Sequence, residues 1–353
     1  MTLNDRIIAF STLGDFLSQF SSENPVPKSN LQCNTDFFDK FLSLINAAQH
    51  KNGWFLPEQV KFSIHQWAKA LTTKNLNIWL APYSISSESE TKTVGIIMAG
   101  NIPLVGFHDL LCILISGHKA LIKPSSNDTL LVKTICDYLI SIQPEFKEKI
   151  SFTDGKLENY DAVIATGSNN TSRYFEYYFK NKQSIIRKNR NSVAVLTGNE
   201  SQEELIALGE DIFRYFGLGC RSVSKLFVPK GYNFDAFFKA MYSFQELIKN
   251  EKYLNNYDYN KAVYLMSKFE LLDNGFIILK EDESYSSPIS SIFYEFYKQY
   301  DDLNKKFSKD EAQIQCIVNY PKNAKHVNFG ETQTPQLNDY ADGIDTIDFL
   351  LKI

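Results

Sequence analysis

The sequence has few of the motifs by which metal and nucleotide sites are usually recognised. It contains no HExxH, and its five histidines do not show the spacing of metal ligands, so no metal is expected. It also contains no GxxxxGK[ST], and FGLGCRS is not a GxGxxG that opens a helix after a strand. The two commonest phosphate-binding loops are therefore excluded.

A strong excess of one charge and a long apolar run are missing as well. The 353 residues include 37 Lys and Arg against 41 Asp and Glu, a net charge of −4, so no nucleic-acid partner is expected. The longest apolar stretch, 104–115, contains His108 and Asp109 and is too short to cross a bilayer, so we expect no membrane span. The opening MTLNDRIIAF carries Asp5 and no long apolar core, which does not match a secretory signal.

Cysteine is sparse and shows no paired pattern. The five cysteines are an odd number without a CxxC pair, which does not favour a disulfide framework, and we expect a cytoplasmic protein with reduced thiols. Cys112, Cys136 and Cys316 lie in apolar runs typical of a core, and Cys33 lies in a polar connection. Cys220 is the cysteine whose surroundings suggest chemistry.

With 44% hydrophobic and 14% aromatic residues, the composition is typical of a folded protein. A chain of 353 residues usually forms more than one domain. Apolar residues at helical spacing predict helices over 3–20, 36–48 and 57–71. From residue 91 onward, short β-branched runs alternate with helical segments, which predicts parallel βαβ units and a doubly wound sheet. The expected fold class is therefore α/β with a helical N-terminus.

The segment FGLGCRS surrounds Cys220 with features that suit a nucleophile. Gly217 and Gly219 remove side chains around the thiol, and Arg221 places positive charge next to it. A thiolate nucleophile needs access and a nearby cation that lowers its pKa, so Cys220 is the candidate nucleophile. A buried structural thiol is the alternative interpretation.

Three further segments place polar residues at the ends of predicted strands. Asn101 in GNIP could donate its amide to an oxyanion, or it could cap a helix. Lys123 in ALIKPSS could bind ribose hydroxyls or a phosphate, or it could be an ordinary surface lysine. In ATGSNNTS, a helix that begins after Gly167 and Ser168 suits a pyrophosphate, although capping explains the same residues.

The order of these segments says more than any one of them. GNIPL, a helix, ALIKPSS, ATGS and then FGLGCRS resembles the aldehyde dehydrogenase superfamily, and most closely its long-chain fatty acyl-CoA reductase branch (LuxC-like). The resemblance covers residues 90–320 and implies an aldehyde dehydrogenase-like fold, with a doubly wound cofactor domain and an α/β catalytic domain. It also implies the reaction, in which NADPH reduces an acyl-CoA to the aldehyde.

The resemblance assigns a role to each candidate residue. Cys220 would accept the acyl group from the acyl-CoA substrate, with coenzyme A as the leaving group, and Asn101 would stabilise the oxyanion. Lys123 and Ser125 would hold the adenosine ribose of the cofactor.

Gly167 and Ser168 would begin the helix beneath the pyrophosphate.

The sequence departs from the superfamily pattern at two positions, and both departures bear on the expected chemistry. Aligning the Ser of ELGGKS with Ser192 places Arg187 where hydrolytic relatives have a general-base Glu, which leaves exchange with a thiol such as coenzyme A as the favoured chemistry. Ser126 follows KPS where many NAD-preferring relatives have an acidic residue, so a cofactor with a 2′-phosphate is permitted.

Domain boundaries complete the expectation. Residues 1–75 would pack as helices on the cofactor domain, 76–196 would bind the dinucleotide, and 197–312 would form the catalytic domain. Residues 313–353 would return to the cofactor domain and contribute to a homo-oligomer.

The acyl donor stays open at this point. A short-chain acyl-CoA, a carrier-protein thioester or an acyl-donating partner protein would fit equally, as would a non-catalytic protein that keeps the fold. The aromatic residues between 234 and 297 could line a channel for a fatty chain, but at helical spacing they are more typical of core.

Overall fold

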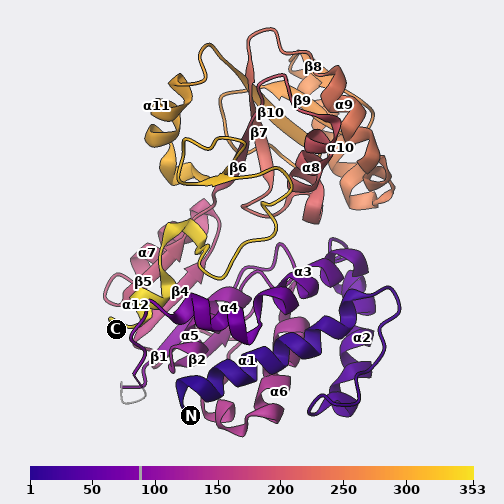
Figure 1. Cartoon of the computed structure of the whole chain (residues 1–353). Helices are drawn as coiled ribbons and strands as arrows, with labels where there is room; N and C mark the ends of the chain where they lie inside the picture. The colour runs from indigo at the N-terminus through magenta and orange to yellow at the C-terminus, as the bar shows by residue number, and fades with distance from the viewer. Residues whose placement is uncertain (87–89) are drawn as a thin grey trace. The chain divides into compact units, whose positions relative to one another are not determined.

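The computed structural model describes residues 1–86 and 90–353, which form two compact units. Unit 1 comprises residues 1–188 together with 336–353, and unit 2 comprises residues 189–335. Figure 1 shows the elements of each unit. Among the described residues, no helix is long and apolar enough to cross a membrane.

Unit 1 contains a five-stranded sheet in which every strand is parallel to its neighbours. The strand order is β3-β2-β1-β4-β5, which matches five of the six strands in the 3-2-1-4-5-6 order of the dinucleotide-binding fold. This confirms the predicted doubly wound sheet. The strands are β1 (Thr93–Ile97), β2 (Lys119–Lys123), β3 (Ile150–Phe152), β4 (Ala162–Thr166) and β5 (Gln183–Arg187).

Alternate residues of each strand face opposite sides of this sheet, and different helices cover the two sides. Ile164 of β4 packs into the large core that includes the helices α5 (Phe107–Ile115) and α6 (Thr129–Ile142). Its neighbours Val163 and Ala165 belong to a separate cluster with Phe179, at the end of α7 (Asn169–Tyr178). Both sides of the central strands are therefore covered, as an all-parallel sheet requires.

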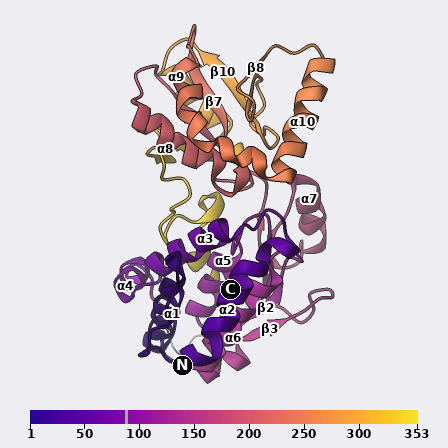
Figure 2. The ribbon, with the colours of Figure 1, turned by 90° about the vertical axis from the view of Figure 1, so that its right-hand side faces the viewer.

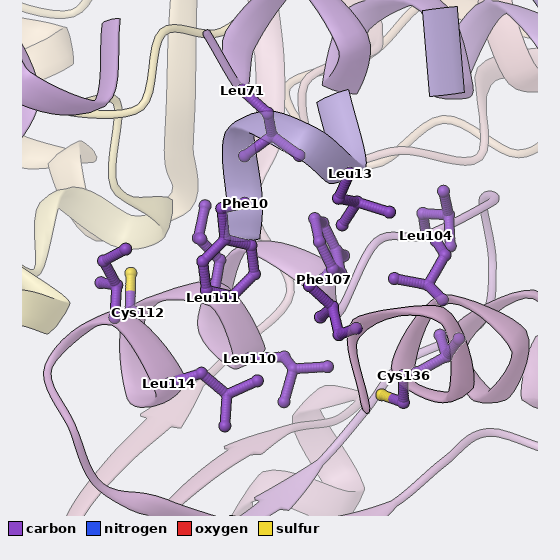
Figure 3. Close-up of a cluster of buried hydrophobic side chains, with 14 of the residues drawn as sticks. Phe10, Leu13, Leu71, Leu104, Phe107, Leu110, Leu111, Cys112, Leu114 and Cys136 are labelled. Atoms are coloured by element: carbon purple, nitrogen blue, oxygen red, sulfur yellow. The ribbon is translucent and has the colours of Figure 1, made fainter. Parts of the chain in front are cut away.

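The helix α5 is the centre of the large core. All of its residues except His108 are buried, so the helix contacts neighbours on every side. Figure 3 shows Leu111 of α5 against Phe10 of α1, with Leu110 and Leu114 directed toward the sheet. A helix this apolar is stable only inside a protein, and the N-terminal helices supply its cover.

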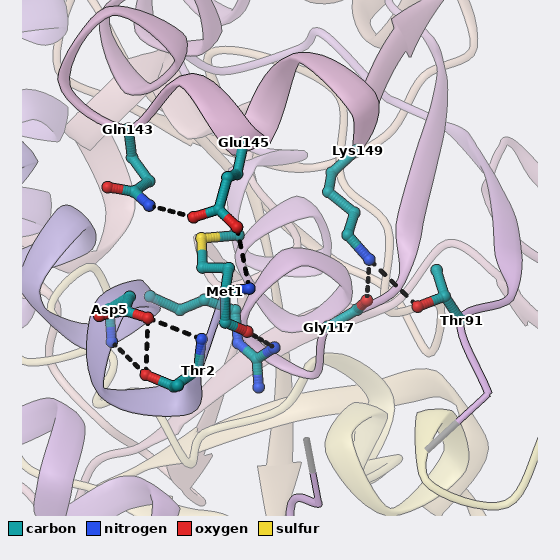
Figure 4. A network of polar contacts seen from close by, with 9 residues as sticks. Met1, Thr2, Asp5, Thr91, Gly117, Gln143, Glu145 and Lys149 are labelled. Atoms are coloured by element: carbon teal, nitrogen blue, oxygen red, sulfur yellow. Dashed lines mark hydrogen bonds and ion pairs between the residues drawn. The ribbon is translucent and has the colours of Figure 1, made fainter. Parts of the chain in front are cut away.

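The three helices predicted for the N-terminal region are confirmed as α1 (Leu3–Ser18), α2 (Asn34–Lys51) and α3 (Pro57–Ala70). A fourth, α4 (Thr73–Leu80), was not predicted. Thr2 and Asp5 form a capping box at the start of α1. Figure 4 shows how the first residues are held: the Met1 amino group pairs with Glu145 at 3.0 Å, below the end of α6.

Unit 2 contains a seven-stranded sheet with the order β12-β11-β6-β7-β10-β9-β8. All neighbouring strands are parallel except β8 and β9. The strands are β6 (Asn191–Val195), β7 (Val223–Pro229), β8 (Leu271–Asp273), β9 (Ile278–Glu281), β10 (Ser291–Tyr297), β11 (Ile314–Val318) and β12 (His326–Val327). The helices are α8 (Gln202–Phe213), α9 (Asp235–Met241), α10 (Glu251–Met266) and α11 (Asp302–Lys309).

Local sequence signals account for several of these elements. Ser201 followed three residues later by Glu204 is a capping-box pattern, and the two residues form this box at the start of α8. The helix α10 stands beside β8 (Figure 2), where the Tyr257 hydroxyl donates to Asp273 at 2.7 Å. Phe234 and Phe237 are buried in the core of unit 2, as their helical spacing indicated.

The units divide at residues 188/189 and 335/336, whereas the boundaries expected from the sequence were 196/197 and 312/313. The difference has a physical reason, because β6 and β11 pair with each other and with β7 in the sheet of unit 2. The segment that rejoins unit 1 is therefore short, and it ends in α12 (Thr346–Leu350), which contacts α5.

A buried ion pair joins this returning segment to the sheet of unit 1. Arg187, the last residue of β5, donates to both carboxylate oxygens of Asp109 on α5, at 3.1 and 2.6 Å. The same guanidinium donates to the Ala341 carbonyl at 2.6 Å and to the Thr346 hydroxyl at 2.9 Å. Burial works against the charge of Arg187, but the Asp109 carboxylate outweighs it and holds the Arg187 pKa above its ordinary value.

We expect Asp109→Asn to lower the free energy of unfolding by about 3–5 kcal/mol, because it leaves the buried Arg187 charge without its counter-ion. All three tryptophans, Trp54, Trp67 and Trp79, lie in unit 1, so urea unfolding followed by tryptophan fluorescence reports on this unit.

The matched control is Glu176→Gln, which breaks a half-exposed pair with Lys188 and should cost less than about 1 kcal/mol. Equal losses in the two variants would contradict a supporting role for the buried pair.

Candidate active site

Cys220 lies in a short loop of unit 2 between a 3-10 turn, η3 (Arg214–Gly217), and β7. Its thiol is half-buried and is not part of a disulfide. Just before the loop, Tyr215, Phe216 and Gly217 all have positive φ angles, of 54°, 57° and 75°. Two large residues in the left-handed region are costly, and such strain concentrates at functional sites.

The backbone of Cys220 is held by a serine from the neighbouring strand. Ser192 of β6 is buried, and its hydroxyl donates to the Cys220 carbonyl at 3.0 Å. The same hydroxyl accepts the Cys316 N–H of β11 at 3.1 Å. One side chain therefore connects two strands of the sheet to the residue predicted to be the nucleophile.

A second set of hydrogen bonds holds the other side of the loop. Arg221 donates from Nε to the Thr332 carbonyl, and Gln333 donates to the Ser222 hydroxyl at 3.2 Å. Thr332 is in turn fixed by Asp211 of α8, whose carboxylate accepts its N–H at 3.0 Å and its hydroxyl at 2.8 Å. Burial raises the pKa of Asp211 to about 6, although these hydrogen bonds limit the rise.

The other cysteines fit the roles expected from their surroundings. Cys112 and Cys136 are fully buried, and burial raises the pKa of both thiols far above the ordinary value. Neither is suited to act as a thiolate at neutral pH. Cys316 is buried as well, which leaves Cys33 and Cys220 as the half-buried thiols.

In unit 1, the other candidate residues lie at one edge of the sheet. Lys123 ends β2 and is in register with Ile97, the last residue of β1, which is in register with Ala165 of β4. Asn101 follows β1, while Gly167 and Ser168 follow β4. The structure therefore brings the predicted oxyanion and cofactor residues of unit 1 to the carboxyl ends of three adjacent strands, where α/β sheets bind ligands.

The two loops after β1 and β2 are packed closely together. A Cβ on Gly100 would collide with the Ser125 side chain, so glycine is required next to Asn101. Asp128, at the start of α6, accepts the Leu104 N–H at 2.6 Å and so crosses from one loop to the other. Leu104 has a φ of 59°, and this hydrogen bond supports its left-handed conformation.

The polar side chains at the carboxyl ends of β2 and β4 have the following surroundings. Lys123 donates to the Gly155 carbonyl at 2.9 Å. The Ser125 hydroxyl accepts the Asn127 N–H at 3.3 Å, and Ser126 is exposed. After β4, Ser168 caps α7 by accepting the Thr171 N–H at 3.3 Å, which is the capping role weighed against pyrophosphate binding.

Asn101 is exposed in unit 1 and Cys220 belongs to unit 2, so their shared role at an oxyanion stays a prediction. Arg187 is accounted for by its contacts with Asp109 and the returning segment, and its guanidinium cannot accept a proton. Within the described part of the chain, no group of three or more His, Cys, Asp or Glu side chains could hold a metal ion.

Comparison with known families decides the identity of the chain. The model of the acyl-CoA reductase (LuxC) family matches residues 83–263. The chain belongs to this family. The match contains the acyl-CoA reductase candidates Asn101, Lys123 and Cys220. No curated protein matches the chain.

Solved structures share the fold of this acyl-CoA reductase family member at low sequence identity. An oxidoreductase from Marinobacter aquaeolei has a TM-score of 0.66 and 12% identity, covering 95% of this chain and 79% of its own. Aldehyde dehydrogenase 21 from Physcomitrella patens, solved with the reaction product succinate, has a TM-score of 0.65 and 11% identity, covering 100% and 89%. An indole-3-acetaldehyde dehydrogenase in complex with NAD+ has a TM-score of 0.64 and 12% identity, covering 92% and 73%. The predicted aldehyde dehydrogenase-like fold is confirmed.

For three residues of the candidate site, no supporting role was predicted from the sequence. Asp211 and Ser192 support the Cys220 loop, and Asp128 supports the loop of Asn101. The available signal was a polar residue in an apolar setting: Asp211 directly precedes Ile212 and Phe213, and Ser192 stands in the strand-forming run SVAVLTG. Such residues are buried only with a partner, which makes them candidates for support roles.

Asp128 generates a pH-dependent prediction. Burial raises its pKa to about 7, the hydrogen bond from Leu104 limits that rise, and its second carboxylate oxygen is buried with no partner among the described residues. The folded chain therefore binds a proton between pH 4 and 7 that the unfolded chain releases, so stability falls as pH rises through this window.

Relative to Asp128→Asn, we expect the wild-type chain to lose about 4 kcal/mol of unfolding free energy between pH 4 and pH 8, since each pKa unit corresponds to about 1.4 kcal/mol. Tryptophan-monitored urea unfolding across this range measures the difference. Asp137→Asn, at the surface of the same helix, is the control and should run parallel to wild type. A constant gap between wild type and Asp128→Asn would contradict the prediction.

Proposed function

We propose that this chain reduces an acyl-CoA thioester to the aldehyde through an acyl group held on Cys220. The observation that carries the proposal is the Cys220 loop itself, in a chain of the acyl-CoA reductase family. The loop presents a half-buried thiol and is fixed on both sides by side chains of its own unit. A nucleophile needs this combination of access and fixed position.

The first step is acyl transfer. The Cys220 thiolate attacks the thioester carbonyl carbon, a new carbon–sulfur bond forms, and the bond to the coenzyme A sulfur breaks. Coenzyme A leaves as a thiolate and takes a proton from solvent. Arg221, anchored at the Thr332 carbonyl, places a fixed positive charge one residue from the thiol and favours the thiolate form.

The tetrahedral oxyanion needs hydrogen-bond donors fixed in advance. The Cys220 N–H belongs to the loop that Ser192 and Gln333 hold, and the Asn101 amide belongs to the loop that Asp128 holds. We assign these two groups as the donors. Each is a donor on a supported backbone segment, so little reorganisation accompanies the reaction.

A nicotinamide dinucleotide fits the sheet edge of unit 1. This edge offers the Lys123 ammonium group, the Ser125 and Ser126 hydroxyls, and the N-terminus of α7, all after adjacent parallel strands. The related indole-3-acetaldehyde dehydrogenase was solved with NAD+. When bound, the nicotinamide supplies the hydride that reduces the acyl group. The neutral, exposed Ser126 leads us to propose NADPH.

Reduction is favoured over hydrolysis by the absence of a base at the expected position. Arg187 stands where hydrolytic relatives have a glutamate, and all of its donor groups with assigned partners face Asp109, Ala341 and Thr346. A guanidinium does not activate water. A long-chain fatty acyl group and a homo-oligomer follow from the resemblance. A cytoplasmic location follows from the sparse, unpaired cysteines, and it completes the proposal.

Mixing the chain with a panel of acyl-CoAs, without NADPH, should add the mass of one acyl group. Cys220→Ser should abolish the adduct, because a hydroxyl lacks the thiolate's nucleophilicity at neutral pH. Intact-mass spectrometry measures both. Cys33→Ser removes the other half-buried thiol and should keep the adduct, and an adduct that persists in Cys220→Ser would refute the assignment.

Ser126→Glu should weaken NADPH binding at least tenfold, because a carboxylate beside the 2′-phosphate repels it, while NADH binding should change less than threefold. Fluorescence titration of each nucleotide measures the two dissociation constants. Ser126→Ala, which adds no charge, is the control. Equal weakening of both nucleotides would place Ser126 away from the 2′-position.

A further inference from the structure

Asp211 of α8 is a fully buried carboxylate that binds one short segment near the end of unit 2. Its Oδ2 accepts the Gly330 N–H at 2.7 Å. Its Oδ1 accepts the Thr332 N–H at 3.0 Å and the Thr332 hydroxyl at 2.8 Å. All three donors are uncharged, and all belong to residues 330–333, which we call the strap.

The strap fits closely against the face of α8 that carries Asp211. Gly330 has a φ of 81°, and a Cβ at this position would come within 3.2 Å of the Ala207 Cβ. Ala207 and Asp211 are four residues apart on the helix, so they lie on the same face. Glycine is therefore favoured where the strap meets α8, and the carboxylate binds the strap next to this contact.

The same strap holds the two residues that follow Cys220. The Thr332 carbonyl accepts from Nε of Arg221, and the Gln333 amide donates to the Ser222 hydroxyl at 3.2 Å. Thr332, Gln333 and Ser222 are all buried. A continuous chain of hydrogen bonds within unit 2 therefore connects Asp211 to the loop of the nucleophile.

These contacts require a carboxylate rather than another polar group. Both oxygens of Asp211 are acceptors, so an asparagine would turn an NH₂ group toward an N–H donor. A protonated acid would likewise turn an O–H toward the strap. Burying a charge between Leu208 and Ile212 of the core opposes folding. A charge retained there to hold one short segment indicates that the position of this segment matters for more than packing.

The charged groups around Asp211 have other partners or face solvent. Glu210 on the same helix opposes the ionisation of Asp211, but it pairs with Arg214 of η3. On the strap, Glu331 is exposed, and on β7, Lys225 pairs with a glutamate of β10. The helices α9 and η4 (Tyr242–Lys249) also pack on α8, and their charged residues are exposed: Asp235, Lys239, Glu246 and Lys249. Burial and the strap donors are therefore the main influences on the pKa of Asp211, which is raised to about 6.

We propose that Asp211 is a positioning residue for the nucleophile: its carboxylate holds the strap, the strap holds Arg221, and Arg221 favours the thiolate of Cys220. This rests on the proposed function, in which Cys220 accepts the acyl group. The reactivity of Cys220 then follows the protonation of a second group besides its own thiol. When Asp211 takes up a proton, the strap loses an acceptor and the thiolate loses its fixed cation.

Alkylation of Cys220 by iodoacetamide, followed by the mass of the Cys220 peptide, tests this without an acyl-CoA. We expect wild type to react about tenfold faster than Asp211→Asn at pH 7.5, which corresponds to a change of about one unit in the thiol pKa. This advantage should fall below about twofold at pH 5, with a midpoint near pH 6, because a protonated aspartic acid resembles asparagine. A merely structural role would give a ratio of rates that does not change with pH.

Thr332 provides a second pair of variants. Thr332→Val removes the hydroxyl and keeps the N–H, so it should slow alkylation about threefold at pH 7.5. Thr332→Ser keeps the hydroxyl and should react within about twofold of wild type. This pair carries the test if Asp211→Asn does not give the circular dichroism spectrum of the folded chain.

Glu203→Gln is the matched control, since it makes the same change from carboxylate to amide at an exposed position of α8. It should leave the alkylation rate unchanged at every pH. The NADPH dissociation constant should be unchanged in all of these variants, because the proposed cofactor residues belong to unit 1.

Equal alkylation rates in wild type and Asp211→Asn, or a ratio that stays constant between pH 5 and pH 8.5, would overturn the inference. A loss in Glu203→Gln as large as that in Asp211→Asn would overturn it as well. The rate of the acyl adduct from hexadecanoyl-CoA should follow the same order of variants. If wild type forms no adduct while the alkylation ratio behaves as expected, the proposed function fails and the effect of Asp211 on the Cys220 thiol stands.

Discussion

The buried pair of Arg187 and Asp109 is the contact on which the organisation of unit 1 depends. Asp109 is the one acidic residue of α5, whose other buried residues are all apolar, and Arg187 ends the edge strand β5. Through Ala341 and Thr346 the same guanidinium holds the segment that returns from unit 2. Because a charge in such a core is tolerated only with its partner, the pair defines where helix, sheet and returning chain meet.

The candidate nucleophile depends on a different kind of support. Cys220 is half-buried, and the backbone that carries its thiol is held from the sheet by Ser192 and from α8 by way of Asp211 and Thr332. Reactive groups are often placed on such short loops with rigid neighbours, since the loop gives access and the neighbours give position. Tyr215 and Phe216, just before the loop, adopt the left-handed conformation, which is energetically unfavourable for large side chains. This strain accompanies the placement of Cys220.

Local patterns were sufficient to predict much of this fold, because periodicity and capping depend on residues three or four apart. The helices of the N-terminus and the capping box of Ser201 are of this kind. The supporting contacts could not be predicted from local patterns, since Asp109 and Arg187 are separated by 78 residues and Asp211 and Thr332 by 121. For the same reason the division into units 1 and 2 was not predicted: strand partners, which no local pattern reveals, assign β6 and β11 to unit 2.

The path of the chain has a consequence for how the protein is made. Unit 2 is one continuous stretch, so all of its residues, including those that hold the Cys220 loop, leave the ribosome before Ala341 and Thr346 do. Unit 1 needs its last eighteen residues, 336–353, to complete the surroundings of Arg187. Domains tend to fold as units during synthesis. We therefore expect unit 2 to fold first and unit 1 to complete its fold last, although synthesis of unit 1 begins earlier.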